Sequence, residues 1–103
     1  MSDLDAKIQD VADYWNYKMP MMAMEECAEC IQAISKVERC EEDEDGFLTD
    51  KGNREYRIRI DELKDEIRDV YISLRALMYM YKISEEDIME RVEKKLNKKY
   101  KED

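Results

Sequence analysis

Three glutamates lie within five residues of one another, in a segment whose pattern predicts a helix. Glu25, Glu26 and Glu29 fall inside the run Met24–Ile34. At about 100° per residue they lie roughly opposite an apolar face of that helix. Small and apolar residues line up with two of these glutamates, above and below them on the same face: Met22, Ala33 and Val37. We therefore expect this face to be partly covered rather than a fully solvated surface, which is the alternative.

Covered carboxylates need a counter-charge, because an unpaired ion loses hydration free energy when it is buried. A second acid set, in which Glu66 and Asp69 are three residues apart like Glu26 and Glu29, follows in a later helical segment. Two such pairs on neighbouring helices would place four carboxylates around one small volume. Oxygen-only ligands of high charge select Mg²⁺ or Mn²⁺, whose common enzymatic use is to hold phosphate oxygens and activate water.

The order and the flanks of these acids resemble the MazG-type all-α nucleoside triphosphate pyrophosphohydrolases. Glu25-Glu26-x-x-Glu29 is similar to the first motif of that family, and Glu66-x-x-Asp69 is similar to the second. The segment between the two motifs is longer here than is usual in the family.

A third element near the C-terminus adds to the resemblance. Asn97-x-Lys99-Tyr100 resembles the family's Asn-x-Lys-aromatic element, which contacts nucleotide phosphate. The Arg that commonly follows this element is absent, since position 103 is Asp.

The resemblance implies hydrolysis of a nucleoside triphosphate to the monophosphate and pyrophosphate. It implies that Mg²⁺, or Mn²⁺ in its place, is held by four carboxylates: Glu26, Glu29, Glu66 and Asp69. Glu25 would serve as a base or would support the ligands. Lys95 and Lys99 would neutralise phosphate charge, and Asn97 would donate a hydrogen bond.

The composition predicts one all-α domain over residues 1–103. Hydrophobic and charged residues each make up 44% of the chain, while two Gly and one Pro leave little material for turns. Apolar spacing predicts helices at about residues 3–18, 20–39 and 55–82, and a fourth after the capping sequence at Ser84. Residues 40–56 are expected to form an exposed acidic loop, and the helices an antiparallel bundle of about four.

The helical patterns also bear on assembly. The two central helices carry apolar residues on more than one side, so we expect a second subunit to cover what one chain cannot. The resemblance to MazG-type proteins likewise implies a homodimer or a homotetramer.

Charge and cysteine content restrict the partners and the compartment. A net charge of −9 argues against binding nucleic acid through a general basic surface. No apolar run approaches the length of a membrane span, and the acidic N-terminus lacks the features of a signal peptide, so we expect a cytoplasmic protein without membrane contact. The chain has no His, so a zinc site using Cys27, Cys30 or Cys40 would need a carboxylate or a second subunit. Small buried thiols in a reducing cytosol are the favoured interpretation.

Two other functions fit the same residues. A non-catalytic acidic helical bundle, such as an interaction protein, would point its acids to solvent. A metal-binding sensor would have the same site without turnover. The acid run at residues 41–45 is expected to be solvated.

Overall fold

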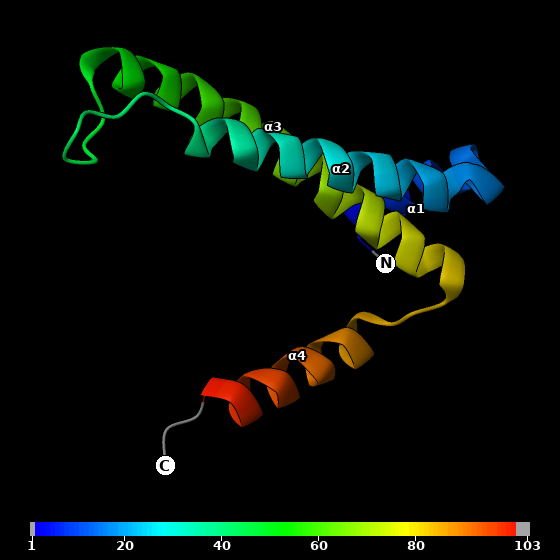
Figure 1. Ribbon diagram of the computed structural model, residues 1–103. Helices are drawn as coiled ribbons and strands as arrows, with labels where there is room; N and C mark the ends of the chain where they lie inside the picture. Colours follow the sequence, from blue (N-terminus) through cyan, green and yellow to red (C-terminus); the bar gives the residue numbers. More distant parts are fainter. Residues whose placement is uncertain (1, 101–103) are drawn as a thin grey trace.

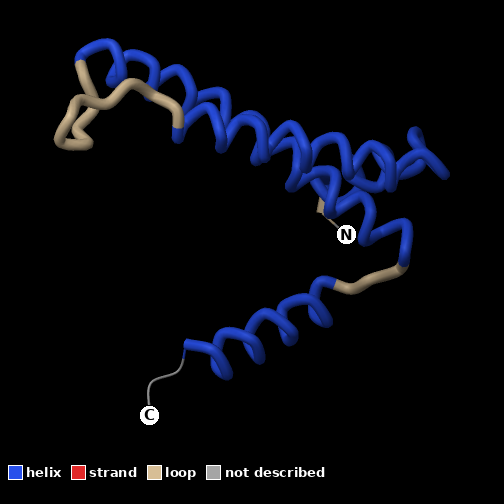
Figure 2. Tube along the Cα trace, in the orientation of Figure 1, coloured by secondary structure: helices blue, strands red, loops and turns tan. Residues whose placement is uncertain are grey.

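The computed structural model describes residues 2–100, with the side chains of residues 2–98, and it is built from helices (Figures 1 and 2). In chain order these are α1 (Asp3–Trp15), the short 3-10 helix η1 (Asn16–Lys18), α2 (Met19–Glu38), α3 (Asp50–Tyr81) and α4 (Glu85–Tyr100). Extended pairing within residues 2–100 is confined to one isolated bridge between Glu42 and Leu48. The prediction of an all-α fold is confirmed.

The first helices begin at identifiable capping residues. Ser2 and Asp5 form a reciprocal capping box, in which Ser2 Oγ accepts a hydrogen bond from the Asp5 backbone N–H at 3.0 Å. Pro20 lies in the first turn of α2, where its missing N–H costs no intrahelical bond. The predicted break near this proline is a single 3-10 turn, so α1 ends at Trp15 rather than near residue 18.

Helix α3 begins at Asp50, earlier than the sequence pattern predicts, so the prediction of a loop over residues 40–56 is corrected. Thr49 caps the helix, because its Oγ1 accepts a hydrogen bond from the backbone N–H of Gly52 at 3.0 Å. Gly52 is buried, and a Cβ at this position would collide with the backbone carbonyl of Glu41. The absence of a side chain is thus what lets the acidic loop close against the first turn of α3.

Helices α2 and α3 run antiparallel along each other and form the centre of the molecule (Figure 1). Small buried residues at their contact allow the helices to approach closely: Ala23, Ala33, Ser73 and Ala76. Helix α1 packs across the end where α2 begins, and a core cluster forms there: Ile8, Ala12, Met19, Ala23 and Ala76. An ion pair between Arg75 and Asp5, with N···O at 2.7 Å, joins α3 to α1.

Helix α4 extends away from the other three helices (Figure 1). Lys82 ends α3 in the left-handed conformation with φ 58°, and the chain then turns sharply. The predicted cap is present, since Ser84 Oγ accepts from the Asp87 backbone N–H at 3.1 Å. The bundle within one chain therefore consists of three packed helices, and α4 is not packed along them.

The chain exposes far more surface than a compact protein of its size. Its accessible surface is 8632 Å², whereas a folded 12.5 kDa monomer exposes about 6,200 Å². Its radius of gyration is 18.0 Å, against about 13 Å for a compact chain of this length. No helix among the described residues is long and apolar enough to cross a membrane.

Large apolar side chains of α2 and α3 are exposed together on one side of the two helices. We call this the outer apolar face. It lines an open hollow of about 380 Å³, and its principal residues are Met24, Cys27, Ala28 and Ile31 of α2 with Leu74 and Tyr81 of α3. Met24 and Ile31 are each 66% exposed. An exposed apolar surface of this kind indicates an interaction site.

Candidate metal centre

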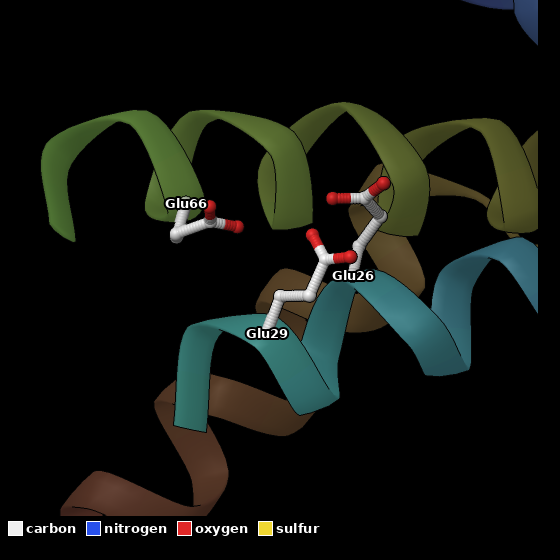
Figure 3. Close-up of side chains that lie close together, drawn as sticks. All are labelled: Glu26, Glu29 and Glu66. Carbon is white, nitrogen blue, oxygen red and sulfur yellow. The ribbon is translucent and has the colours of Figure 1, made fainter. Parts of the chain in front are cut away.

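Three carboxylates from two helices converge between α2 and α3 (Figure 3). Glu26 and Glu29 come from α2 and Glu66 comes from α3, and one oxygen of each lies within 4.8 Å of the others. We call these three residues the carboxylate cluster. Two ligands on opposite sides of a bound Mg²⁺ are about 4.2 Å apart. Small side-chain adjustments would therefore bring all three oxygens onto one ion.

The packing of the helices explains why these glutamates meet. The face of α2 that carries Glu26 is turned toward α3, with buried Ala23 and Ala33 on either side of it along the helix. Glu66 lies on the corresponding face of α3, which continues to buried Ser73. The prediction of a partly covered acidic face holds for Glu26, which is half-buried, whereas Glu25 and Glu29 are exposed. The more apolar face of α2 is the one exposed to solvent.

Two oxygens of the carboxylate cluster lack partners. Glu26 Oε2 and Glu66 Oε2 are inaccessible to solvent and form no hydrogen bond within the part of the chain that the structure describes. Burial raises the pKa of Glu26, and the charges of Glu29, Asp69, Glu66 and Glu25 raise it further. Burial likewise raises the pKa of Glu66, with Glu29 and Asp69 adding to the effect. A divalent cation would satisfy these oxygens and remove the repulsion.

Asp69, the fourth predicted ligand, lies beside the carboxylate cluster but is engaged elsewhere. Its Oδ1 accepts a hydrogen bond from Arg68 Nε at 3.0 Å, and its side chain is 33% exposed. Its charge acts on both Glu26 and Glu66, so it is close to the cluster. The pairing of Asp69 with Arg68 was not predicted from the sequence, although the two residues are adjacent in the chain.

The other predicted site residues lie outside the carboxylate cluster. Glu25 is exposed on α2, one residue before Glu26. Lys95 and Asn97 are exposed on α4. Asn97 lines a broad hollow whose other lining residues all belong to α4: Asp87, Glu90, Arg91, Glu93 and Lys94. Lys99 lies in the last turn of α4, and its side chain is outside the described residues.

The cysteines take no part in the carboxylate cluster. All three are free thiols, with Cys27 and Cys30 partly buried and Cys40 buried. Cys40 Sγ donates to the backbone carbonyl of Lys36 at 3.7 Å. Their burial agrees with the favoured interpretation of small packing residues.

Two basic residues next to the carboxylate cluster were not identified from the sequence. Lys36 and Arg59 line the same pocket as Glu29 and Glu66. The signal was present as spacing, since Lys36 follows Glu29 by seven residues and Arg59 precedes Glu66 by seven. Because α2 and α3 run antiparallel, Lys36 and Arg59 both lie on the same side of the carboxylate cluster along the helix axes.

Comparisons of the chain with protein-family models, with curated proteins and with solved structures give no match. The chemistry of the site therefore has to follow from its own residues.

Proposed function

We propose that this protein is a Mg²⁺-dependent hydrolase that splits a nucleoside triphosphate into the monophosphate and pyrophosphate. The observation that carries the proposal is the convergence of Glu26, Glu29 and Glu66, with two buried oxygens that lack hydrogen-bond partners. The resemblance of the acid motifs to those of MazG-type pyrophosphohydrolases supports the substrate class. Mn²⁺ would be accepted in place of Mg²⁺, because the same oxygen ligands suit both ions.

Each residue of the site has a role in this proposal. Glu26, Glu29 and Glu66 hold the ion, and Asp69 completes the set when it releases Arg68. A bound Mg²⁺ supplies Lewis-acid stabilisation of phosphate charge and lowers the pKa of water. Glu25, the exposed residue before Glu26 on α2, would accept a proton from water that enters from solvent.

We also propose that the protein works as a homodimer or a homotetramer. If each of two chains buried its excess of about 2,400 Å² over a compact monomer's surface, the total of about 4,800 Å² would fall within the range for obligate dimers, about 2,000–5,000 Å². The outer apolar face supplies an apolar centre for such an interface. Lys95, Asn97 and Lys99 would contact nucleotide when an α4, from the same chain or a second copy, packs beside a carboxylate cluster.

Light scattering coupled to size exclusion tests the assembly. We expect a dimer or tetramer at micromolar concentration, and dissociation of Ile31→Glu, which places a charge at the centre of the outer apolar face. Phe47→Glu is the matched control, since Phe47 is at least as exposed as Ile31 but lies in the loop between α2 and α3. A wild-type chain that stays monomeric would contradict the proposal.

Product analysis with a panel of ribo- and deoxyribonucleoside triphosphates tests the activity. Phosphorus NMR distinguishes pyrophosphate and monophosphate from the diphosphate and phosphate that other hydrolases release. We expect pyrophosphate with Mg²⁺ or Mn²⁺ and none with EDTA. Binding of Mg²⁺ without turnover of any nucleotide would leave a metal-binding protein and overturn the enzymatic proposal.

A further inference from the structure

A small pocket between α2 and α3 carries acidic groups at one end and basic groups at the other. Its volume is about 120 Å³, and it is lined by Glu29, Gln32, Ala33, Lys36, Arg59, Glu62 and Glu66. Two members of the carboxylate cluster form the acidic end. Lys36 from α2 and Arg59 from α3 form the basic end, and the two helices contribute one cation each.

The register of the two helices places these cations together. Lys36 lies two turns beyond Glu29 and Arg59 lies two turns before Glu66, a displacement of about 10.5 Å along each axis. The Arg59 side chain extends back toward the carboxylate cluster, because its Nη1 donates to Glu62 Oε1 at 2.8 Å. Lys36 forms no ion pair within 4 Å in the described part of the chain.

A second hollow continues from the basic end. Its volume is about 270 Å³, and Lys36 and Arg59 line it together with Arg39 and Glu55. The two cations are thus shared by the pocket that reaches the carboxylates and by a wider space beyond it. Positive charge predominates at this end and negative charge at the other.

This polarity fits a metal-bound polyphosphate. A free polyanion would be repelled by Glu29, Glu62 and Glu66, which together outnumber the two cations in the pocket. A divalent ion at the carboxylate cluster reverses that balance. Phosphates that contact the ion at one end can then bind Lys36 and Arg59 at the other, as charge-assisted hydrogen bonds.

We propose that Lys36 and Arg59 form a phosphate-binding subsite for the polyphosphate chain of a nucleotide whose other phosphates contact the ion held by the carboxylate cluster. This inference rests on the proposed function for the ion, but the subsite itself binds phosphate without any need for hydrolysis. The competing role for the two cations is neutralisation of the nearby acids. In that role they would weaken Mg²⁺ binding and would leave phosphate affinity unchanged.

Isothermal titration with inorganic tripolyphosphate at saturating Mg²⁺ separates the two roles. We expect binding to the wild-type protein and about tenfold weaker binding to Lys36→Gln and to Arg59→Gln, because each loses a hydrogen bond between charged groups. Lys64→Gln and Arg57→Gln are the matched controls, since these exposed residues of α3 lie outside both hollows. The controls should keep wild-type affinity.

Folding is controlled independently. Arg59→Gln loses the hydrogen bond to Glu62, and this loss would lower the stability of the folded protein. Lys36→Gln loses none of the described ion pairs, so its phosphate affinity tests the subsite even if Arg59→Gln is unstable. Lys36→Arg should recover most of the affinity lost in Lys36→Gln, since it restores the cation.

The subsite and the hydrolase fail in different ways. Tripolyphosphate affinity within twofold of wild type in both glutamine variants, or no Mg²⁺-dependent binding to the wild-type protein, overturns the subsite. Nucleotide turnover with an unchanged KM in the variants also overturns it and leaves the hydrolase intact. A wild-type protein that turns over no nucleotide but loses tripolyphosphate binding on Lys36→Gln keeps the subsite and loses the hydrolase.

Discussion

The guanidinium of Arg68 donates from Nε to Asp69 Oδ1 at 3.0 Å, at the edge of the carboxylate cluster. The same arginine also pairs with Asp65 at 3.4 Å. Its positive charge lowers the pKa of Glu66, against the larger effects of burial and neighbouring acids. Arg68 therefore competes with a metal ion in two ways, by engaging one predicted ligand and by repelling a cation.

We predict that Arg68→Gln binds Mg²⁺ several-fold more tightly than the wild-type protein. Repulsion between a unit charge and a divalent ion across a few ångströms of water is on the order of 1 kcal/mol, and the freed Asp69 adds a ligand. Titration calorimetry measures the affinity, with Arg57→Gln as a control for net charge. Unchanged or weaker binding would show that Asp69 and Arg68 lie outside the ion's reach.

The carboxylates themselves should be essential for turnover. We predict that Glu29→Gln and Asp69→Asn each abolish hydrolysis and leave the helical circular dichroism unchanged. Glu29 is exposed and the Asp69 side chain is 33% exposed, so neither substitution disturbs the core. Replacing Glu42 and Glu44 with Gln should have little effect, because both lie in the exposed loop before α3. Near-normal rates in both site variants would refute the site assignment.

The covered acidic face could be predicted because helical spacing alone places Glu26 between Met22 and Ala33. The pairing of this face with Glu66 followed from the repeated three-residue spacing. The start of α3 could not be predicted in the same way. The first turn of α3, at Asp50 and Gly52, has no periodic apolar residues from which a helix could be predicted. The helix begins there because Thr49 caps it and because the backbone of Glu41 approaches Gly52 closely.

The sequence also could not predict that Lys36 and Arg59 would lie in one pocket. Lys36 and Arg59 are far apart in the chain, and they share a pocket only because α2 and α3 run antiparallel in one particular register. The separation of α4 was also not predicted. Its amphipathic pattern, with Val92 and Leu96 on one side, indicates a helix that packs against a neighbour, yet both residues are exposed in the single chain.

Gly52 offers a test of the loop closure that is independent of function. Replacing a helical glycine by alanine ordinarily stabilises a protein by up to about 1 kcal/mol. Here we predict that Gly52→Ala destabilises it, by about 1–3 kcal/mol, because the added Cβ meets the Glu41 carbonyl. Urea unfolding measures the change, with Asn53→Ala as the neighbouring exposed control. A stabilised variant would show that the loop does not rest on α3.

The pH dependence of stability follows from the raised pKa values of Glu26 and Glu66. A carboxyl whose pKa is raised by folding holds a proton that the unfolded chain has already released. The free energy of unfolding should therefore fall as pH rises from the unfolded glutamate pKa, about 4.3, through the higher pKa of the folded state. Melting temperatures measured in EDTA from pH 4 to pH 7 check this sign. Glu26→Gln should flatten the curve over that range.

Mg²⁺ should reverse this trend, because it binds the deprotonated cluster in the folded state and not in the unfolded chain. At a hundredfold excess over Kd the stabilisation is about 2.7 kcal/mol, enough to raise the melting temperature of a domain this size by several degrees. The increase should fade toward pH 4, as protons displace the ion, and should vanish in Glu29→Gln. Ca²⁺ should also stabilise but support hydrolysis poorly, since its looser coordination positions phosphate less strictly. A melting temperature indifferent to millimolar Mg²⁺, compared with NaCl at equal ionic strength, would leave Glu26, Glu29 and Glu66 as partly buried surface acids and remove the basis of the proposed hydrolase.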